Sequence, residues 1–165
     1  MMAPELDRKL PLARIPRTGL TETVTASAAE CAALAARFAL PEIRSLTCRF
    51  RLDPLPGGAI AAAGALRAEL VQICVASLDP FPVTIAEDFA VRFVPTGRES
   101  DDPDPDAVDE IAFAGTVLEL GEAAAEQLAL ALDPYPRKPD PAPEATAAPP
   151  HRSPFTALRG PRRPS

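Results

Sequence analysis

The feature that most constrains the fold is an alternation of apolar and polar residues over three long segments, residues 46–52, 60–70 and 81–93. A period of two places successive side chains on opposite faces of an extended chain, which is typical of strands with one buried face. Gly57-Gly58 and the stretch "SLDP" at 77–80 separate the segments and predict turns. We therefore expect an antiparallel meander of three long strands.

Helical spacing occurs on both sides of these strands. The stretch "GLTETVT" favours a short strand, and Ser27 after it is a suitable N-cap for a helix that ends before Pro41. A second helix begins near Leu120 and ends at Asp133-Pro134. This order predicts an α+β fold, in which an N-terminal strand-helix unit and a C-terminal helix pack on the antiparallel sheet.

The three cysteines are expected to be reduced and buried. Cys48 lies on the apolar side of its strand, and Cys31 has no paired spacing with the others that would indicate a disulfide framework or a zinc ribbon. Near Leu70-Val71 the apolar phase breaks, which predicts either a β-bulge or a strand end covered on both faces. Cys74 follows, and we expect it to close the strand beneath Phe81 as a small hydrophobe.

Length and proline content predict one domain with less regular ends. The chain has 165 residues and 21 prolines, which gather near the ends and in one internal loop. We assign residues 1–15 to an N-terminal arm, 16–139 to the α+β domain, with an acidic proline-rich loop at 96–114, and 140–165 to a disordered Pro/Ala linker and basic tail. Because no apolar run could span a membrane or form a signal peptide, we expect a cytoplasmic protein.

Residues that catalysis or cofactor binding would need are scarce. The one histidine, His151, lies in the expected tail, so a cysteine nucleophile lacks a general base. The glycines match neither a dinucleotide fingerprint nor a Walker loop. Ser77, three residues after Cys74, is not a ligand that zinc favours, and acidic pairs such as Asp101-Asp102 are more typical of a solvated surface than of a Mg²⁺ site. We expect no enzyme, no cofactor and no small-molecule substrate.

The net charge of −6 argues against a general nucleic-acid binder, but acidic and basic residues are segregated. Five arginines, assigned to the side of the predicted strands opposite the core, are the candidates for RNA contact: Arg44, Arg49, Arg51, Arg67 and Arg92. Phosphate contacts from such arginines depend on salt and carry little sequence preference. The alternative is an ordinary solvated sheet face with cross-strand ion pairs.

The C-terminal tail offers a second candidate surface. From residue 151 onward it has no acidic residue. Its candidate binding residues are Phe155, Leu158, Arg159, Arg162 and Arg163. An apolar pair three residues apart, followed by arginines, could dock in a groove of a partner protein. A disordered terminus without a partner is the alternative.

Three stretches together resemble a known family: "QICVASLDPFPVTIAEDFAVRFVP", "LELGEAAAEQLALALDPYPRKP" and "SPFTALRG". They are similar to the YceD family, the large ribosomal RNA subunit accumulation proteins of bacteria and plastids, over about residues 10–140 plus the tail motif around Phe155. The matching motif residues are Cys74, Leu78, Phe81, Glu119, Leu120, Gly121, Glu122, Pro134 and Pro136. Where family members carry a second cysteine in Cys-x-x-Cys, this chain has Ser77.

The resemblance implies a non-enzymatic factor that promotes 23S ribosomal RNA accumulation or processing and assembly of the large ribosomal subunit. It implies ribosomal RNA or a pre-50S particle as the partner, and no catalytic residue. The residues leave open an alternative, a protein-interaction module that acts on a ribosomal protein or a processing enzyme without contacting RNA.

Overall fold

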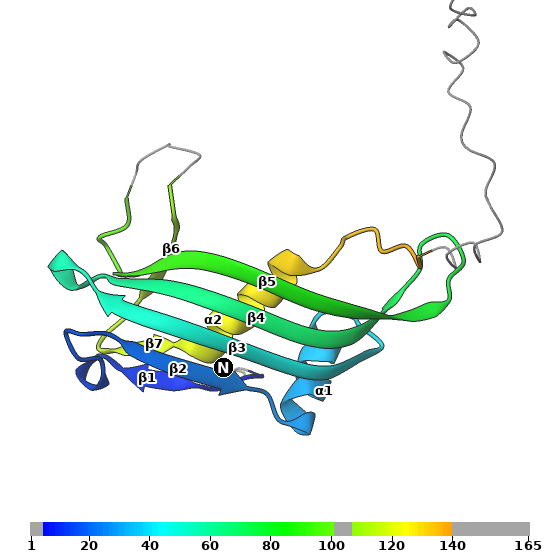
Figure 1. Ribbon diagram of the computed structural model, residues 1–165, viewed down its shortest axis with the longest axis horizontal. Helices are drawn as coiled ribbons and strands as arrows, with labels where there is room; N and C mark the ends of the chain where they lie inside the picture. The colour runs from blue at the N-terminus through cyan, green and yellow to red at the C-terminus, as the bar shows by residue number, and fades with distance from the viewer. Residues whose placement is uncertain (1–4, 101–106, 140–165) are drawn as a thin grey trace, which may run out of the picture.

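The computed structural model describes residues 5–100 and 107–139 (Figure 1). The elements in chain order are β1 (Lys9–Pro11), η1 (Leu12–Arg14), β2 (Leu20–Thr25), α1 (Ala28–Arg37), β3 (Glu42–Pro54), η2 (Pro56–Gly58), β4 (Ile60–Ile73), β5 (Pro80–Pro95), β6 (Asp109–Phe113), β7 (Val117–Glu119) and α2 (Leu120–Ala131), where η denotes a short 3-10 helix. The α+β class is confirmed, and α2 packs on the sheet as predicted.

The main sheet has the order β2-β3-β4-β5-β6. Strands β3, β4 and β5 form the antiparallel meander that the alternation predicted, and β2 pairs with β3, also antiparallel. The prediction that residues 96–114 are entirely loop is wrong, because residues 109–113 form β6, parallel to β5. The apolar side chains of Ile111 and Phe113 pack on the core, and this packing outweighs the acidic character of the surrounding segment.

A second, two-stranded sheet joins the N-terminal segment to the start of α2. Strand β1 pairs with β7 antiparallel, with Lys9 opposite Glu119. Leu6 and Leu10 are buried, with exposed fractions of 1% and 2%, and both belong to the hydrophobic core. The segment 5–11 is thus part of the packed domain.

Helix α1 begins with a capping box at Ser27. The backbone N–H of Glu30 donates to Ser27 Oγ at 3.2 Å, and the N–H of Ser27 donates to Glu30 Oε1 at 2.9 Å. These bonds satisfy two amide donors that a helix start would otherwise leave unpaired. The predicted N-cap is confirmed, and the buried face of the helix is formed by Cys31, Leu34 and Ala35.

One face of the main sheet carries the core. Leu46, Phe50, Leu66 and Phe93 point toward the helices and are almost fully buried. Both α1 and α2 lie behind the sheet in the view of Figure 1, so the face toward the viewer carries no helix of the described chain. The sheet therefore has one packed face and one open face, as expected of strands that alternate in polarity.

The phase break near Leu70-Val71 has one of the two causes that the sequence left open, a strand end covered on both faces, since β4 itself pairs with β5 without a bulge. Val71 and Gln72 are buried next to Leu70, so this end of β4 is covered on both sides. On the neighbouring strand the register shifts between Ile43 and Ser45, which indicates a β-bulge. Gln72 Nε2 donates to the carbonyl of Asp133, so the polar side chain buried at this strand end is paired.

Candidate nucleic-acid interface

The open face of the main sheet brings together four of the five arginines proposed from the strands, whereas Arg44 lies at the register shift of β3 and pairs with Glu42. Side chains directly opposite each other on neighbouring strands lie on the same face. In the observed register Arg67 lies opposite Thr47, and Arg92 lies opposite Ala61, which in turn faces Asp53. Since positions 47, 49, 51 and 53 of β3 point to the same side, each of four consecutive rows across the sheet holds one arginine.

The rows determine how far apart the cations are. The order along the strand direction is Arg67, Arg49, Arg51 and Arg92, from β4, β3, β3 and β5 respectively. Rows on one face are two residues apart, which corresponds to about 6.8 Å per row and about 20 Å from first to last. We define these four residues as the arginine face. Neighbouring strands add about 4.8 Å sideways, so Arg51 on β3 and Arg92 on β5 also lie about 10 Å apart across the sheet.

Small side chains form the floor between the arginines. Apart from the arginines, Asp53 and Asp88, the outward positions of β2–β5 in the same rows are occupied by Thr21, Thr23, Thr25, Thr47, Ala61, Ala63, Ala65, Ala86 and Ala90. Alanine and threonine leave the surface shallow, so a large partner can approach the sheet closely. None of the outward positions of β2–β5 in these rows holds an aromatic residue, so this face has no aromatic platform for base stacking.

Two of the four arginines have partners within the described residues. Arg51 Nη2 donates to the carbonyl of Thr18 at 2.7 Å and to Asp53 Oδ1 at 3.0 Å. Arg67 Nη1 lies 3.6 Å from Asp88 Oδ1. These ion pairs are well exposed, and exposed pairs of this kind contribute only about 0–1 kcal/mol, so a phosphate can displace the acid.

Arg49 and Arg92 form no hydrogen bond or ion pair with any residue in the described ranges, and both are exposed. The same face also carries acids: Asp53, Asp88, Glu110 of β6 opposite Arg92, and Glu69 one row beyond Arg67. Within the described residues, none of them is paired with Arg49 or Arg92. The face can therefore hold two phosphates with free guanidinium groups, and two more if the paired arginines exchange partners.

The motif at 119–122 lies on the other side of the sheet and connects three parts of the chain. Leu120 is buried, and its N–H donates to the carbonyl of Arg8 at 2.9 Å. Gly121 lies so close to the Leu6 carbonyl that a β-carbon would collide with it. Glu122 binds Arg37 of α1 with both carboxylate oxygens, at 2.8 and 3.1 Å.

These contacts explain the residue types of this motif by packing. A glycine is needed where the N-terminal backbone crosses α2, and a carboxylate is needed to join α2 to α1. A second bidentate pair, Arg8 with Glu30 at 2.7 and 2.8 Å, ties the same N-terminal segment to α1. The Arg8 guanidinium and the Ser27 amide hold the pKa of Glu30 down at about 2. The motif residues of this segment stabilise the fold.

Cys74 lies in the turn between β4 and β5. The Cys74 amide donates to the carbonyl of Asp79, and the Leu78 amide donates to the carbonyl of Cys74. The thiol is buried but is not part of the main core cluster. Hydrogen bonds from Ser77, and then from the Lys138 backbone, lower its pKa to about 6, and desolvation opposes them only weakly. In contrast, burial raises the pKa of Cys48 to about 12.

The turn also exposes one of the apolar motif residues. Leu78 has an exposed fraction of 74% and a backbone φ of 63°, in the left-handed region that branched side chains rarely adopt. Phe81, at the start of β5, is buried. The segment with Pro134 and Pro136 lies beside this turn, since the Val75 amide donates to the Pro136 carbonyl at 2.9 Å.

The tail candidates lie outside the described residues, and so do Asp101, Asp102 and His151. This applies to the whole proposed set at the C-terminus: Phe155, Leu158, Arg159, Arg162 and Arg163. Their contacts with the domain therefore stay a prediction.

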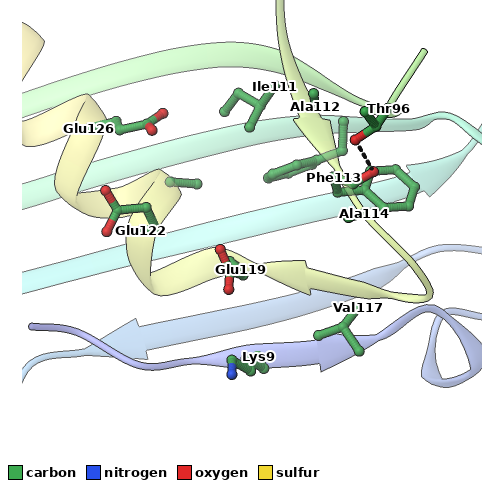
Figure 2. A pocket seen from close by; sticks show the side chains of 12 residues that line it. Lys9, Thr96, Ile111, Ala112, Phe113, Ala114, Val117, Glu119, Glu122 and Glu126 are labelled. Carbon is green, nitrogen blue, oxygen red and sulfur yellow. Dashed lines mark hydrogen bonds between the residues drawn. The ribbon is translucent and has the colours of Figure 1, made fainter. Parts of the chain in front are cut away.

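Sequence reasoning missed a groove of about 500 Å³ on the helix side of the sheet, between β6, β7 and α2. In Figure 2, Glu119 lies just before α2, and Glu122 and Glu126 lie on that helix. Ile111 and Phe113 belong to β6. Burial and the neighbouring Glu122 raise the pKa of Glu126. The helical spacing of the acids was visible in the sequence, but β6 was not recognised, and so the apolar wall could not be predicted.

The described ranges contain no cluster of three or more histidine, cysteine, aspartate or glutamate side chains suited to holding a metal ion. In the same parts of the chain, no helix combines the length and the apolar character required to cross a membrane.

Comparison with known proteins identifies a family. The family model described as "Large ribosomal RNA subunit accumulation protein YceD" matches residues 62–153, which is more than half of the chain. The match begins in β4 and ends before Phe155, so it is narrower than the resemblance over residues 10–140 and the tail. Searches of curated proteins and of solved structures found no significant match. The matched part includes both the turn with Cys74 and the motif at 119–122, and the chain belongs to the YceD family of large ribosomal RNA subunit accumulation proteins.

Proposed function

We propose that this protein promotes accumulation of the large-subunit ribosomal RNA by binding the sugar-phosphate backbone of that RNA, or of an assembling particle, on the arginine face. The single observation that carries the proposal is the presence of one arginine in each of four consecutive rows on an open sheet face. Such a surface has no need of a catalytic group, and the family description names an accumulation role rather than a reaction.

The chemistry of the face supports contact with the RNA backbone more than with bases. Guanidinium groups bind phosphate through paired N–H donors, and the alanines and threonines between them allow close approach. These rows lack the aromatic side chains on which unpaired RNA bases commonly stack, and phosphate contacts carry no sequence information directly. We therefore infer weak sequence preference and a strong dependence on salt. The role would require the protein to be present where ribosomes are assembled, expected from the sequence to be the cytoplasm.

A second candidate function is supported by a different observation. Leu78 projects a large apolar side chain into solvent from a backbone conformation that costs energy in most residues. Val75 of the same turn is exposed as well, and two apolar side chains held together are suited to contact with a protein, such as a ribosomal protein or a processing enzyme. Under this alternative the arginine face is an ordinary solvated surface.

The first experiment is depletion of the protein in its own cells, with measurement of the ratio of 23S to 16S ribosomal RNA and of 23S precursors. We expect a selective fall in mature 23S RNA. Re-expression of the wild-type chain should restore the ratio, and the variant with Arg49, Arg51 and Arg67 changed to alanine should not. An unchanged ratio on depletion would contradict a role in ribosomal RNA accumulation.

Complementation by a Leu78→Ser variant separates the two candidates. If the arginine variant restores the ratio and Leu78→Ser does not, protein contact at the turn accounts for the function and RNA contact at the sheet does not. Both variants must first be shown to accumulate at the wild-type level, because loss of the protein would mimic loss of function.

A further inference from the structure

The groove between β6, β7 and α2 has two kinds of wall. Its apolar part is formed by Phe93, Ile111, Phe113, Val117 and Ala123. Its charged part has three carboxylates and one cation: Glu119, Glu122, Glu126 and Lys9. The volume of about 500 Å³ lies within the range of ordinary ligand pockets, and an apolar floor with an acidic rim suits a peptide that is both cationic and apolar.

Two of the three carboxylates are available to such a peptide. Glu122 is already neutralised by Arg37, whereas Glu119 and Glu126 form no ion pair with the described residues. Glu126 also lies close enough to Glu122 to be repelled by it, in a partly desolvated position. A cation placed beside Glu126 would relieve this repulsion.

The chain itself contains a segment with the matching chemistry. Residues 151–165 include four arginines and no acid, and Phe155 and Leu158 supply two apolar side chains three residues apart. The other acid-free stretch with four cations, residues 8–21, belongs to the folded domain, where Leu10 is buried in the core. The complementarity in charge and in apolar character is therefore specific to this segment.

The connection is long enough to allow docking within one molecule. The path from Glu126 to Pro139 is at most roughly 36 Å, because the rest of α2 rises 1.5 Å per residue and the eight residues after it extend about 3.5 Å each. The fifteen residues 140–154 can span up to about 50 Å when extended. The linker is therefore long enough for Phe155 to reach the groove.

We propose that residues 151–165 dock in cis in this groove, with Phe155 and Leu158 against the apolar wall and tail arginines beside Glu119 and Glu126. Docking would hold the tail on the helix side of the sheet, opposite the arginine face. The tail would then be a part of the folded domain instead of an extension of the RNA-binding surface. This inference does not depend on the proposed function.

The test uses the full-length ¹⁵N-labelled chain and compares amide chemical shifts of the wild type with those of Phe155→Ser/Leu158→Ser. We expect the shift changes to concentrate at Ile111, Phe113 and Ala123 and to persist on dilution. Ser165→Ala, a change at the far end of the same tail, is the matched control and should leave the groove resonances in place.

A second arm changes the groove instead of the tail. Glu119→Gln/Glu126→Gln should increase the backbone mobility of residues 155–159, measured by the heteronuclear NOE, while Glu87→Gln, an exposed acid outside the groove, should not. Unaltered groove resonances in the tail variant together with an unaltered tail NOE in the groove variant would overturn the proposal. Shift changes that disappear on dilution would also overturn it, since they would indicate that the tail of a second copy occupies the groove. A groove that responds only to an added foreign cationic peptide would overturn it as well.

Discussion

Changing Arg49, Arg51 and Arg67 to alanine removes three of the four cations of the arginine face. Each phosphate neutralised on a single strand contributes about 0.7 to the slope of log affinity against log salt. Four contacts predict a slope of about −2.8, and the variant, which retains Arg92, should have a slope of about −0.7. Over a rise from about 50 to about 200 mM salt, wild-type affinity should fall roughly 50-fold and that of the variant about 3-fold.

The wild-type slope itself distinguishes two states of the face. If the ion pairs of Arg51 and Arg67 persist in the complex, only Arg49 and Arg92 reach phosphate, and the slope should be about −1.4. A slope near −2.8 would mean that phosphate displaces Asp53 and Asp88. The assay is fluorescence anisotropy with a labelled RNA at a series of salt concentrations.

The matched control removes three exposed arginines that lie outside the four rows, Arg14, Arg98 and Arg137. It changes the net charge by the same amount, so any general effect of charge appears in both variants. The reasoning is refuted if the control lowers the slope as much as the face variant does, or if the face variant keeps the wild-type slope. Thermal unfolding of each variant should be measured first, and we expect changes of less than about 1 kcal/mol per exposed arginine.

Three further predictions concern the fold and the thiols. Gly121→Ala should lower the free energy of unfolding by about 1–3 kcal/mol in urea titration, because the added methyl group meets the Leu6 carbonyl; equal or greater stability would show that the N-terminal segment does not pack there. The low pKa of Glu30 means that its stabilisation is complete above about pH 4.5 and is lost as the pH falls toward 2. The free energy of unfolding from urea titration should therefore fall by about 1–2 kcal/mol across this pH range in the wild type, and Glu30→Gln should lack this fall. The same dependence of stability on pH in both proteins would contradict the prediction. Cys74 should react with iodoacetamide faster than Cys48 at neutral pH, and its rate should be half-maximal near pH 6. Mass spectrometry of the alkylated peptides measures both rates, and faster alkylation of Cys48 would contradict the prediction.

The order of strands and helices could be predicted because its signals are local. The alternation at residues 46–52 and 81–93 depends only on the two-residue repeat of a strand, and the cap at Ser27 depends on the next three residues. In contrast, β6 and β1 are short and owe their strand conformation to partners far away in the chain. Segments this short contain too few alternating residues for a strand to be predicted from the sequence.

The candidate site shows the same division. The sequence placed Arg49, Arg51, Arg67 and Arg92 on the polar sides of their strands, which follows from alternation alone. Whether these sides form one face, and whether the four side chains fall into consecutive rows, depends on the register between strands. Register is set by the summed packing of many apolar pairs and by turn geometry, which no single segment contains.

The sequence by itself determined the α+β class, the three long strands, the two helices and the chemistry available on each strand side, because each of these follows from local periodicity and from residue type. Only the tertiary structure decided that the Leu6 carbonyl lies against Gly121, that Glu122 binds α1, and that an acidic groove opens beside β6. The first two contacts join segments far apart in the chain, with a separation of 85 residues between Arg37 and Glu122, and the groove requires β6 to pair with β5. Their formation depends on the whole core packing at once, and for that reason they have no signature in any one stretch of the chain.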